Sequence, residues 1–286
     1  MRLKRFAMLM VVCMMMLVLT AVVAMAQQAQ PPPAAPGTVT YNTVFTKLAK
    51  GQQVFCNSVS SPDTAACRER CEGVDYIWIE MQHSPLTWRE CQDLINVIVS
   101  AGCIPFVRVP QASNASDIQK ATDCGALGII VPMVESVEEA RNAVMFTRKP
   151  IGDVNNPNIK PWGINSTGGG AAGRLWGRDH RTNFNNNIFI MIMIETPMGV
   201  GVIDRILEEV PGINGVMVAS TDFSLQSGYS EDDPGFWYLE RIVRKSVLAH
   251  NVTLFAKPVW MQIPGYMAFL GRRPDVVPPI PKLYVP

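Results

Sequence analysis

The chain has 286 residues, of which 48% are hydrophobic and 17% are charged, and its formal net charge is +1. This composition can bury a large core, so it argues against a disordered chain and against a small module held together by disulfides. Three of the 25 basic residues fall within the first 26 positions, which hold no acidic residue, so the remainder is slightly acidic. Because nucleic-acid binding requires clustered Lys and Arg, we expect no nucleic-acid partner.

The N-terminus has the features of an export signal. Residues 1–5 are basic, residues 6–26 form an uncharged apolar run, and the run closes on Ala24-Met25-Ala26. This small-any-small pattern is read by signal peptidase, so we expect a signal peptide over 1–26 and a periplasmic or secreted protein. The alternative is an uncleaved anchor, since such a run can span a bilayer, and a membrane would be a partner only in that way. Residues 27–40 are rich in Pro and Ala and indicate a flexible linker.

From residue 41 onwards, short apolar runs alternate with helical patterns. Residues 188–194 read Ile-Phe-Ile-Met-Ile-Met-Ile without polar alternation, which is typical of a strand buried on both faces in a parallel sheet covered by helices. Seven such strands are expected, over residues 53–58, 75–81, 105–110, 127–133, 188–195, 215–220 and 253–259.

Helix signals lie between these strands. Thr87 with Glu90, and Ser136 with Glu139, match the capping box that begins a helix, and Asp233-Pro234 predicts a helix running to about residue 250. We therefore expect an α/β fold, with a (β/α)8 barrel over residues 41–286. An open doubly wound sheet is the second choice, weakened because no GxGxxG follows the first strand.

The C-terminal part fits this barrel less well. Residues 265–270 read as a short helical candidate, and Asp275–Val277 as a remnant of strand eight before a proline-rich end without a final helix. The expected barrel is therefore incomplete at strand and helix eight.

The cysteines that follow the apolar N-terminal run are even in number, which permits disulfides in an exported protein. Cys67 and Cys71 are four apart on an expected helix without a nearby His, so we expect small buried thiols, with room for one bridge, rather than a zinc site. The six are Cys56, Cys67, Cys71, Cys91, Cys103 and Cys124.

Ionisable side chains gather at the C-terminal ends of four expected strands, the edge where barrel active sites are built. Two carboxylates from neighbouring strands suit a hard cation such as Mg²⁺ or Mn²⁺, a His can transfer protons near neutral pH, and an Arg can bind a carboxylate or an enolate. The alternative is structural, with the two acids pairing the arginine and the histidine serving only the fold. The residues are Glu80 and His83, Arg108, Glu195, and Ser220-Thr221-Asp222.

These stretches resemble the HpcH/HpaI aldolase and citrate lyase family, in particular its metal-dependent class II pyruvate aldolases of the 2,4-dihydroxyhept-2-ene-1,7-dioate and 2-keto-3-deoxyglucarate type. The resemblance implies a TIM barrel of the phosphoenolpyruvate/pyruvate-domain kind. The matching segments are Val74–Pro85, Pro105–Pro110, Gly128–Ala140, Ile190–Thr196 and Gly215–Ser224.

The resemblance also implies roles for individual residues. The metal ligands would be Glu195 and Asp222, holding Mg²⁺ or Mn²⁺, with Co²⁺ as a further candidate. The base would be His83, with Glu80 as its dyad partner, and Arg108 would stabilise the enolate and bind substrate. Ser220 and Thr221 stand where the family shapes its pocket for the substrate carboxylate.

The implied reaction is carbon–carbon cleavage of a 4-hydroxy-2-oxo acid into pyruvate and an aldehyde through a metal-stabilised enolate. The partners would be these small molecules, and a homo-oligomer remains open. Two alternatives also remain: a weakened exported barrel that binds a cation and small carboxylates, and an acyl-CoA lyase of the citrate lyase β-subunit type. Lys257, late in the seventh strand, is the candidate for a Schiff-base mechanism.

Several positions depart from the family pattern. Glu80 replaces the usual Asp, Gln82 a usual Glu, Met193 a polar residue, and Ser220-Thr221 stand in place of Gly-Pro-Ala. Such changes fit an altered substrate or a weakened enzyme. The glycine-rich run at 168–173 corresponds in the family to a mobile segment over the substrate, so we expect either a lid or a solvated linker there.

Overall fold

A computed structural model describes residues 39–112, 114–150, 163–166, 168–177, 179–284 and 286. The expected signal peptide and nearly all of the expected linker lie outside these residues, so both stay predictions. Among the helices that the structure does describe, none combines the length and the apolar character needed to cross a membrane.

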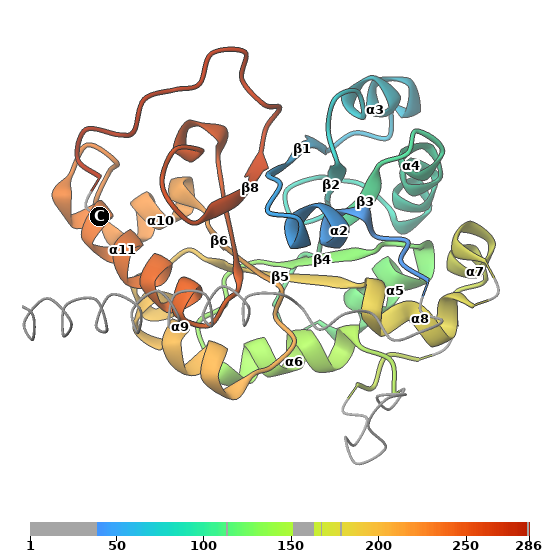
Figure 1. The fold of residues 1–286 in the computed structure, drawn as a ribbon. Coiled ribbons are helices and arrows are strands. Elements are labelled where there is room, and N and C mark those ends of the chain that lie inside the picture. Colours follow the sequence, from blue (N-terminus) through green and yellow to red (C-terminus); the bar gives the residue numbers. More distant parts are fainter. Residues whose placement is uncertain (1–38, 113, 151–162, 167, 178, 285) are drawn as a thin grey trace, which may run out of the picture. The chain divides into compact units, whose positions relative to one another are not determined.

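Eight parallel strands in the described part of the chain close into a barrel in sequence order, with β1 hydrogen-bonded to β8 (Figure 1). The (β/α)8 barrel is thereby confirmed, and the open doubly wound sheet is excluded. The strands are β1 (Val54–Val59), β2 (Tyr76–Glu80), β3 (Ile104–Arg108), β4 (Gly128–Val131), β5 (Phe189–Ile194), β6 (Gly215–Val218), β7 (Thr253–Ala256) and β8 (Tyr266–Leu270).

Helices connect the strands and cover the outside of the barrel (Figure 1). They are α2 (Thr43–Ala49), α3 (Thr64–Arg70), α4 (Trp88–Ser100), α5 (Ala115–Cys124), α6 (Val137–Thr147), α7 (Gly170–Trp176), α8 (His180–Asn187), α9 (Pro197–Glu209), α10 (Ser220–Ser227), α11 (Pro234–Ala249) and the 3₁₀ turn η1 (Pro258–Trp260).

The helix signals of the sequence act as expected. Thr87 caps α4 with both hydrogen bonds of the capping box: its hydroxyl accepts from the backbone N–H of Glu90, and its own N–H donates to the Glu90 carboxylate. Asp233 caps α11, whose first residue is a proline. The sequence thus fixes these helix ends through local hydrogen bonding.

The expectation for strand eight was wrong. Residues 266–270, read as a helix, form β8, and Asp275–Val277 form no strand. Gly265 and Gly271 flank the strand with φ of 98° and 138°, values that L-residues rarely adopt, so a helix cannot continue through either end. The barrel is closed rather than incomplete at strand eight, although no helix follows in the described residues of the C-terminal segment.

Two apolar layers hold the barrel together. One fills its interior and includes Tyr76, Trp78 and Phe106, and the other lies between strands and helices and includes Ile77 and Ile79. The alternation follows from the two-residue repeat of a strand, which sends successive side chains to opposite faces. An uninterrupted apolar run is therefore what such a strand needs.

All six cysteines of the barrel are buried and free. The expectation of small buried thiols is confirmed, and the single bridge that the sequence allowed is absent from the described residues.

Gly128 is expected to be intolerant of any side chain. A Cβ there would lie 2.2 Å from the Phe106 ring, which is fully buried with ring centroids 4.6 Å from Tyr76 and 5.4 Å from Phe189. Because that ring cannot move aside, Gly128→Ala should lower the free energy of unfolding by about 1–3 kcal/mol. Gly201→Ala, in open space on α9, should raise it by up to ~1 kcal/mol. Urea denaturation measures both, and equal effects of the two changes would contradict this account.

Candidate functional site

The acidic and basic side chains of the rim continue the inward-facing positions of their strands. Trp78, Phe106 and Met193 belong to the interior layer. Glu80, Arg108 and Glu195 each follow one of them by two residues, so the strand repeat directs them to the same face. The three groups lie at the C-terminal ends of β2, β3 and β5, as the sequence predicted.

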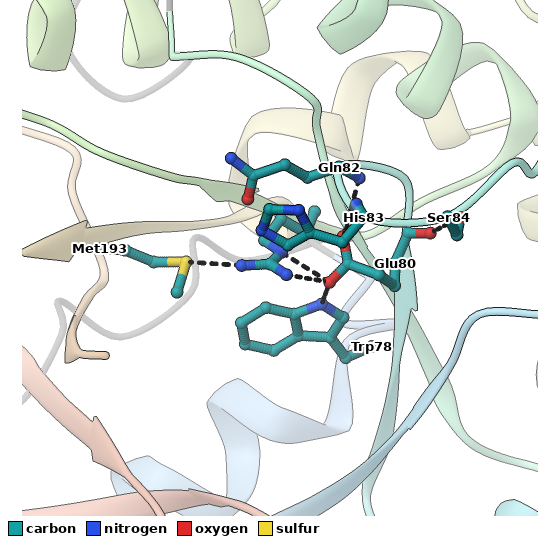
Figure 2. A network of polar contacts seen from close by, with 7 residues as sticks. Trp78, Glu80, Gln82, His83, Ser84 and Met193 are labelled. Carbon is teal, nitrogen blue, oxygen red and sulfur yellow. Dashed lines mark hydrogen bonds and ion pairs between the residues drawn. The ribbon is translucent and has the colours of Figure 1, made fainter. Parts of the chain in front are cut away.

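Glu80 and Arg108 form an ion pair that is largely buried, with each side chain 11% exposed. One carboxylate oxygen of Glu80 accepts from Arg108 Nε at 2.6 Å, from Arg108 Nη2, and from the indole of Trp78 at 3.2 Å (Figure 2). Burial opposes ionisation of Glu80, but the hydrogen bond and charge of Arg108 lower the pKa of this carboxyl. Glu80 is therefore held as a carboxylate, and its partner is the arginine.

The expected dyad between Glu80 and the His83 imidazole is not formed. The second carboxylate oxygen of Glu80 accepts from the backbone N–H groups of Gln82, at 2.7 Å, and His83, at 3.0 Å. The extra methylene of Glu, compared with Asp, lets this carboxylate fold back onto its own turn. Figure 2 shows the His83 ring directed into the cluster on the side of Met193, and the His83 residue is exposed. Among the described residues the imidazole has no hydrogen-bond partner, so Glu80 positions the backbone of His83 and not its ring.

Glu195 and Asp222 converge. Glu195 is 2% exposed at the end of β5, and Asp222 lies in the first turn of α10, after β6. Burial raises the pKa of Glu195, the Met133 N–H opposes that rise, and the charge and side-chain hydrogen bond of Asp222 add to it. Asp222 thus lies close enough to Glu195 for its charge to act on that carboxylate, whereas their role as metal ligands stays a prediction.

Sequence reasoning missed two supporting groups. Met133 donates its backbone N–H to Glu195 Oε2 at 2.6 Å and has a φ of 50°, an uncommon value for a residue with a side chain. Such strain is often stored at functional sites. Trp78 supports Glu80 and also lies 5.2 Å below the Arg108 guanidinium. Trp78 could have been found from the sequence, because it lies two residues before Glu80 on the same strand and so faces the same side. Nothing in the sequence indicates the role of the Met133 backbone.

The remaining candidates lie around the rim in different settings. Ser220 and Thr221 lie in the first turn of α10, which has no side-chain cap, so the backbone N–H groups of this turn have no side-chain acceptor from the cap residue. Lys257 pairs with Glu231, whose other oxygen accepts from the Trp260 indole at 3.2 Å. The ammonium of Lys257 is thus held in an ion pair with the Glu231 carboxylate. This pairing stabilises its charged form, whereas a Schiff base requires a neutral amine, so it argues against the Schiff-base alternative.

The acid pair fits a divalent cation. Neither Glu195 nor Asp222 forms an ion pair with Lys, Arg or His in the part of the chain that the structure describes. Groups of three or more His, Cys, Asp or Glu that could hold a metal are absent from the same residues. Two carboxylates with water or substrate in the other positions are a usual arrangement for Mg²⁺. The buried charge of Glu195 would be compensated by such an ion.

The raised pKa of Glu195 predicts that this carboxylate destabilises the metal-free protein. The folded state holds the proton more tightly than the unfolded chain does, so ionisation costs stability above the ordinary pKa of 4.5 and nothing below it. In EDTA at pH 7, Glu195→Gln should be more stable than the wild type, because the amide still accepts from Met133 without a charge. The difference should vanish as the pH falls below about 4.5. Urea denaturation at several pH values measures it, and a loss of stability in the variant at pH 7 would refute the prediction.

The fold and the rim together define a parallel barrel whose site is assembled from acidic and basic residues at the C-terminal ends of its strands. The sequence model of the HpcH/HpaI aldolase/citrate lyase family matches residues 54–257 of this chain. The chain therefore belongs to the HpcH/HpaI aldolase/citrate lyase family, and the resemblance seen in its motifs is confirmed.

Two relatives found by sequence comparison are named as aldolases. The 2-keto-3-deoxy-L-rhamnonate aldolase of Klebsiella pneumoniae subsp. pneumoniae is 32% identical over 178 residues, which is 61% of this chain and 62% of that protein. The match thus spans less than two thirds of that relative. The hydroxypyruvate/pyruvate aldolase of Rhizorhabdus wittichii is 31% identical over 191 residues, 66% of this chain and 71% of that protein. The crystal structure of an HpcH/HpaI aldolase from Desulfitobacterium hafniense superimposes with a TM-score of 0.69 at 26% identity, covering 79% of this chain and 89% of that one.

Proposed function

We propose that this chain is a lyase that uses a divalent cation to cleave a 4-hydroxy-2-oxo acid into pyruvate and an aldehyde. The observation that carries the proposal is the convergence of Glu195 and Asp222 at the ends of β5 and β6, close enough to Arg108 for its charge to act on Glu195. Membership of an aldolase family and the names of the relatives support a lyase. The identity of the substrate as a 4-hydroxy-2-oxo acid goes beyond what family membership supports and is part of the proposal.

Glu195 and Asp222 would hold the cation, and Mg²⁺ or Mn²⁺ suits their hard oxygen donors best. When bound, the ion supplies a Lewis acid that polarises the keto oxygen of the substrate. Met133 keeps Glu195 in place through its backbone hydrogen bond. Since Glu195 is buried and forms no ion pair with Lys, Arg or His in the described structure, its charge is available to a bound ion.

Arg108 is arranged to bind the anionic part of the substrate. Its Nε and Nη2 are occupied by Glu80, whereas Nη1 lies 4.0 Å from the sulfur of Met193. A thioether is a weak acceptor, so it does not compete with a carboxylate or an enolate oxygen for that N–H. The uncapped first turn at Ser220 and Thr221 supplies further N–H donors for a carboxylate. Met193, which departs from the family pattern, thus leaves Nη1 of the guanidinium without a strong acceptor.

His83 is placed to move the proton. In the cleavage direction its imidazole takes the proton from the C4 hydroxyl, the C4–O bond becomes the aldehyde carbonyl, and the C3–C4 bond breaks. The electron pair of that bond passes to C3 as the enolate of pyruvate, which Arg108 stabilises, and a proton then returns to C3 to form the methyl group. His83 is exposed, so substrate can reach its ring, and histidine is the side chain that most often transfers protons in enzymes.

Pyruvate release from a panel of 4-hydroxy-2-oxo acids tests this proposal. We expect release that is lost after exhaustive treatment with EDTA and restored by Mg²⁺ or Mn²⁺. The panel should include a 2-keto-3-deoxy sugar acid, which the named relatives bring into consideration. Cleavage that continues at the same rate after complete removal of metal would overturn the cation-dependent mechanism.

A second function is favoured by one observation, the absence of a dyad at His83. A base without an orienting partner is a weaker catalyst, so the site would then bind a cation and small carboxylates without turnover. Calorimetry with pyruvate and Mg²⁺ would in that case show binding, while no member of the panel would be cleaved.

A further inference from the structure

The glycine-rich segment lies at the end of the barrel opposite to the catalytic rim, so it is not the lid expected from the sequence. Gly168 and Gly169 lead into α7, where the Trp176 indole donates to the carbonyl of Gly125 at 2.9 Å. Gly125 lies just before β4, and α8 ends shortly before β5 begins. Both are N-terminal ends of strands, whereas Glu195 follows the C-terminal end of β5. A solvated linker is also excluded for Gly170–Trp176, because this stretch is a helix.

A small cavity of about 130 Å³ lies beside this segment. Its walls come from the end of α5, from Lys149 after α6, from α7 with the glycines on either side of it, and from the start of α8. Its lining includes the side chains of Lys149, His180 and Arg181, together with Asp123 and the backbone of Gly168–Gly170. No residue of the proposed catalytic site takes part in it.

The cavity carries an excess of positive charge. Lys149 is 4% exposed and donates to two neutral oxygens, Asn165 Oδ1 at 3.1 Å and Ser166 O at 2.8 Å. Neither Lys149 nor Arg181 forms an ion pair with a carboxylate among the described residues. Asp123, the one acid in the lining, accepts a hydrogen bond from Gln119. A buried cation without an ion pair is costly, so an anion in this cavity would be stabilised by it.

His180 supplies an unsatisfied polar atom at the same place. The residue is 4% exposed, and its buried Nδ1 has no hydrogen-bond partner. Burial, followed by the charges of Lys149 and Arg181, lowers the pKa of His180 to about 4, so the ring is neutral at pH 7. A neutral imidazole can present an N–H donor at Nδ1. The loss of solvation of this atom is uncompensated in the described structure.

We propose that this cavity binds a small tetrahedral oxyanion of the phosphate class, held by Lys149 and Arg181 beside the His180 ring. The size of the cavity admits one such group and no nucleotide. Lys149 and Arg181 outnumber Asp123, so the lining carries one net positive charge, which favours an anion. α8 begins at His180 without a side-chain cap. The His180 N–H donates to the carbonyl of Gly177 at 3.2 Å, and the next N–H groups of the first turn add donors for the same anion. Two kinds of ligand carry such a phosphate group, inorganic phosphate and a phosphate monoester.

Calorimetry on the whole chain in EDTA tests the proposal, with inorganic phosphate in one arm and glycerol phosphate in the other. We expect saturable binding that Arg181→Gln weakens about tenfold or more, the loss that one charge-assisted hydrogen bond implies. Arg181 is exposed, so this variant should fold. Arg205→Gln, which removes an exposed cation on α9, should bind as the wild type does. The arm that binds more tightly identifies the source of the ligand.

Histidine NMR locates the anion, because the chain has three histidines in different places. Phosphate should shift the ring signals of His180 and leave those of His83, at the rim, and His250, beside Asp204, unchanged. No saturable binding, equal affinity in Arg181→Gln and the wild type, or a shift of His83 in place of His180 would each overturn the proposal.

Discussion

Replacing His83 by Ala is expected to lower the rate of pyruvate release by about 10²–10⁴-fold, the usual contribution of a general acid–base group. The affinity for pyruvate and Mg²⁺ should change little, because Arg108, Glu195 and Asp222 remain in place. Folding should also be unaffected, since the His83 side chain is exposed and makes no hydrogen bond within the described structure. Single-turnover kinetics measure the chemical step, and calorimetry measures the binding.

His250→Ala is the matched control for this experiment. His250 lies on the outside of the barrel, where its ring contacts Asp204 at 3.2 Å. Its loss should leave both rate and affinity as they are. A His83→Ala variant that cleaves as fast as the wild type would assign the proton transfer to another group and remove the imidazole from the mechanism.

Replacing Glu80 by Ala is expected to lower the free energy of unfolding by about 3–5 kcal/mol, the cost of leaving a buried partner without its counter-charge. Arg108 would then be an unpaired cation in a site where its side chain is 11% exposed. The backbone N–H groups of Gln82 and His83 would lose their acceptor as well, so the turn that carries the base would loosen. Activity should fall with stability, because both Arg108 and His83 are positioned through Glu80.

Urea denaturation measures the loss, and Glu209→Ala provides the comparison. Glu209 also pairs with arginines, Arg141 and Arg205, but its side chain is 39% exposed. Its removal should therefore cost no more than about 1 kcal/mol. Similar effects of the two substitutions would show that the Glu80–Arg108 pair behaves as a surface salt bridge, and our account of the rim would be wrong.

The identity of the rim residues was predictable because one physical rule governs them. In a parallel barrel the C-terminal strand ends meet, so polar residues that follow apolar runs gather there. Glu80, Arg108, Glu195 and Asp222 were found in this way. Their partners were not, because a strand pattern says which face a side chain takes but not which of several neighbours it contacts. For example, the strand pattern could not show that Glu80 pairs with Arg108 and not with the His83 ring.

The sequence was least informative for short apolar stretches, which suit a strand and a helix equally well. Tyr266–Leu270 is short and apolar, and periodicity alone does not distinguish such a stretch in a strand from one in a helix. The pairing of β8 with β1 and β7 decides the matter, and that pairing exists only once the other seven strands have closed around the interior. The same holds for the glycine-rich segment, whose position at the N-terminal end of the barrel depends on the packing of Trp176.

The sequence by itself determined the barrel, its helix caps and the kinds of side chain at its rim, because these follow from residues that are neighbours along the chain. Only the tertiary structure decided which of those side chains touch. It placed Asp222 near Glu195 and paired Glu80 with Arg108. It also brought Lys149, His180 and Arg181 around one cavity at the opposite end. These contacts join residues that come from different elements of the barrel, and closure of the whole barrel fixes their distances.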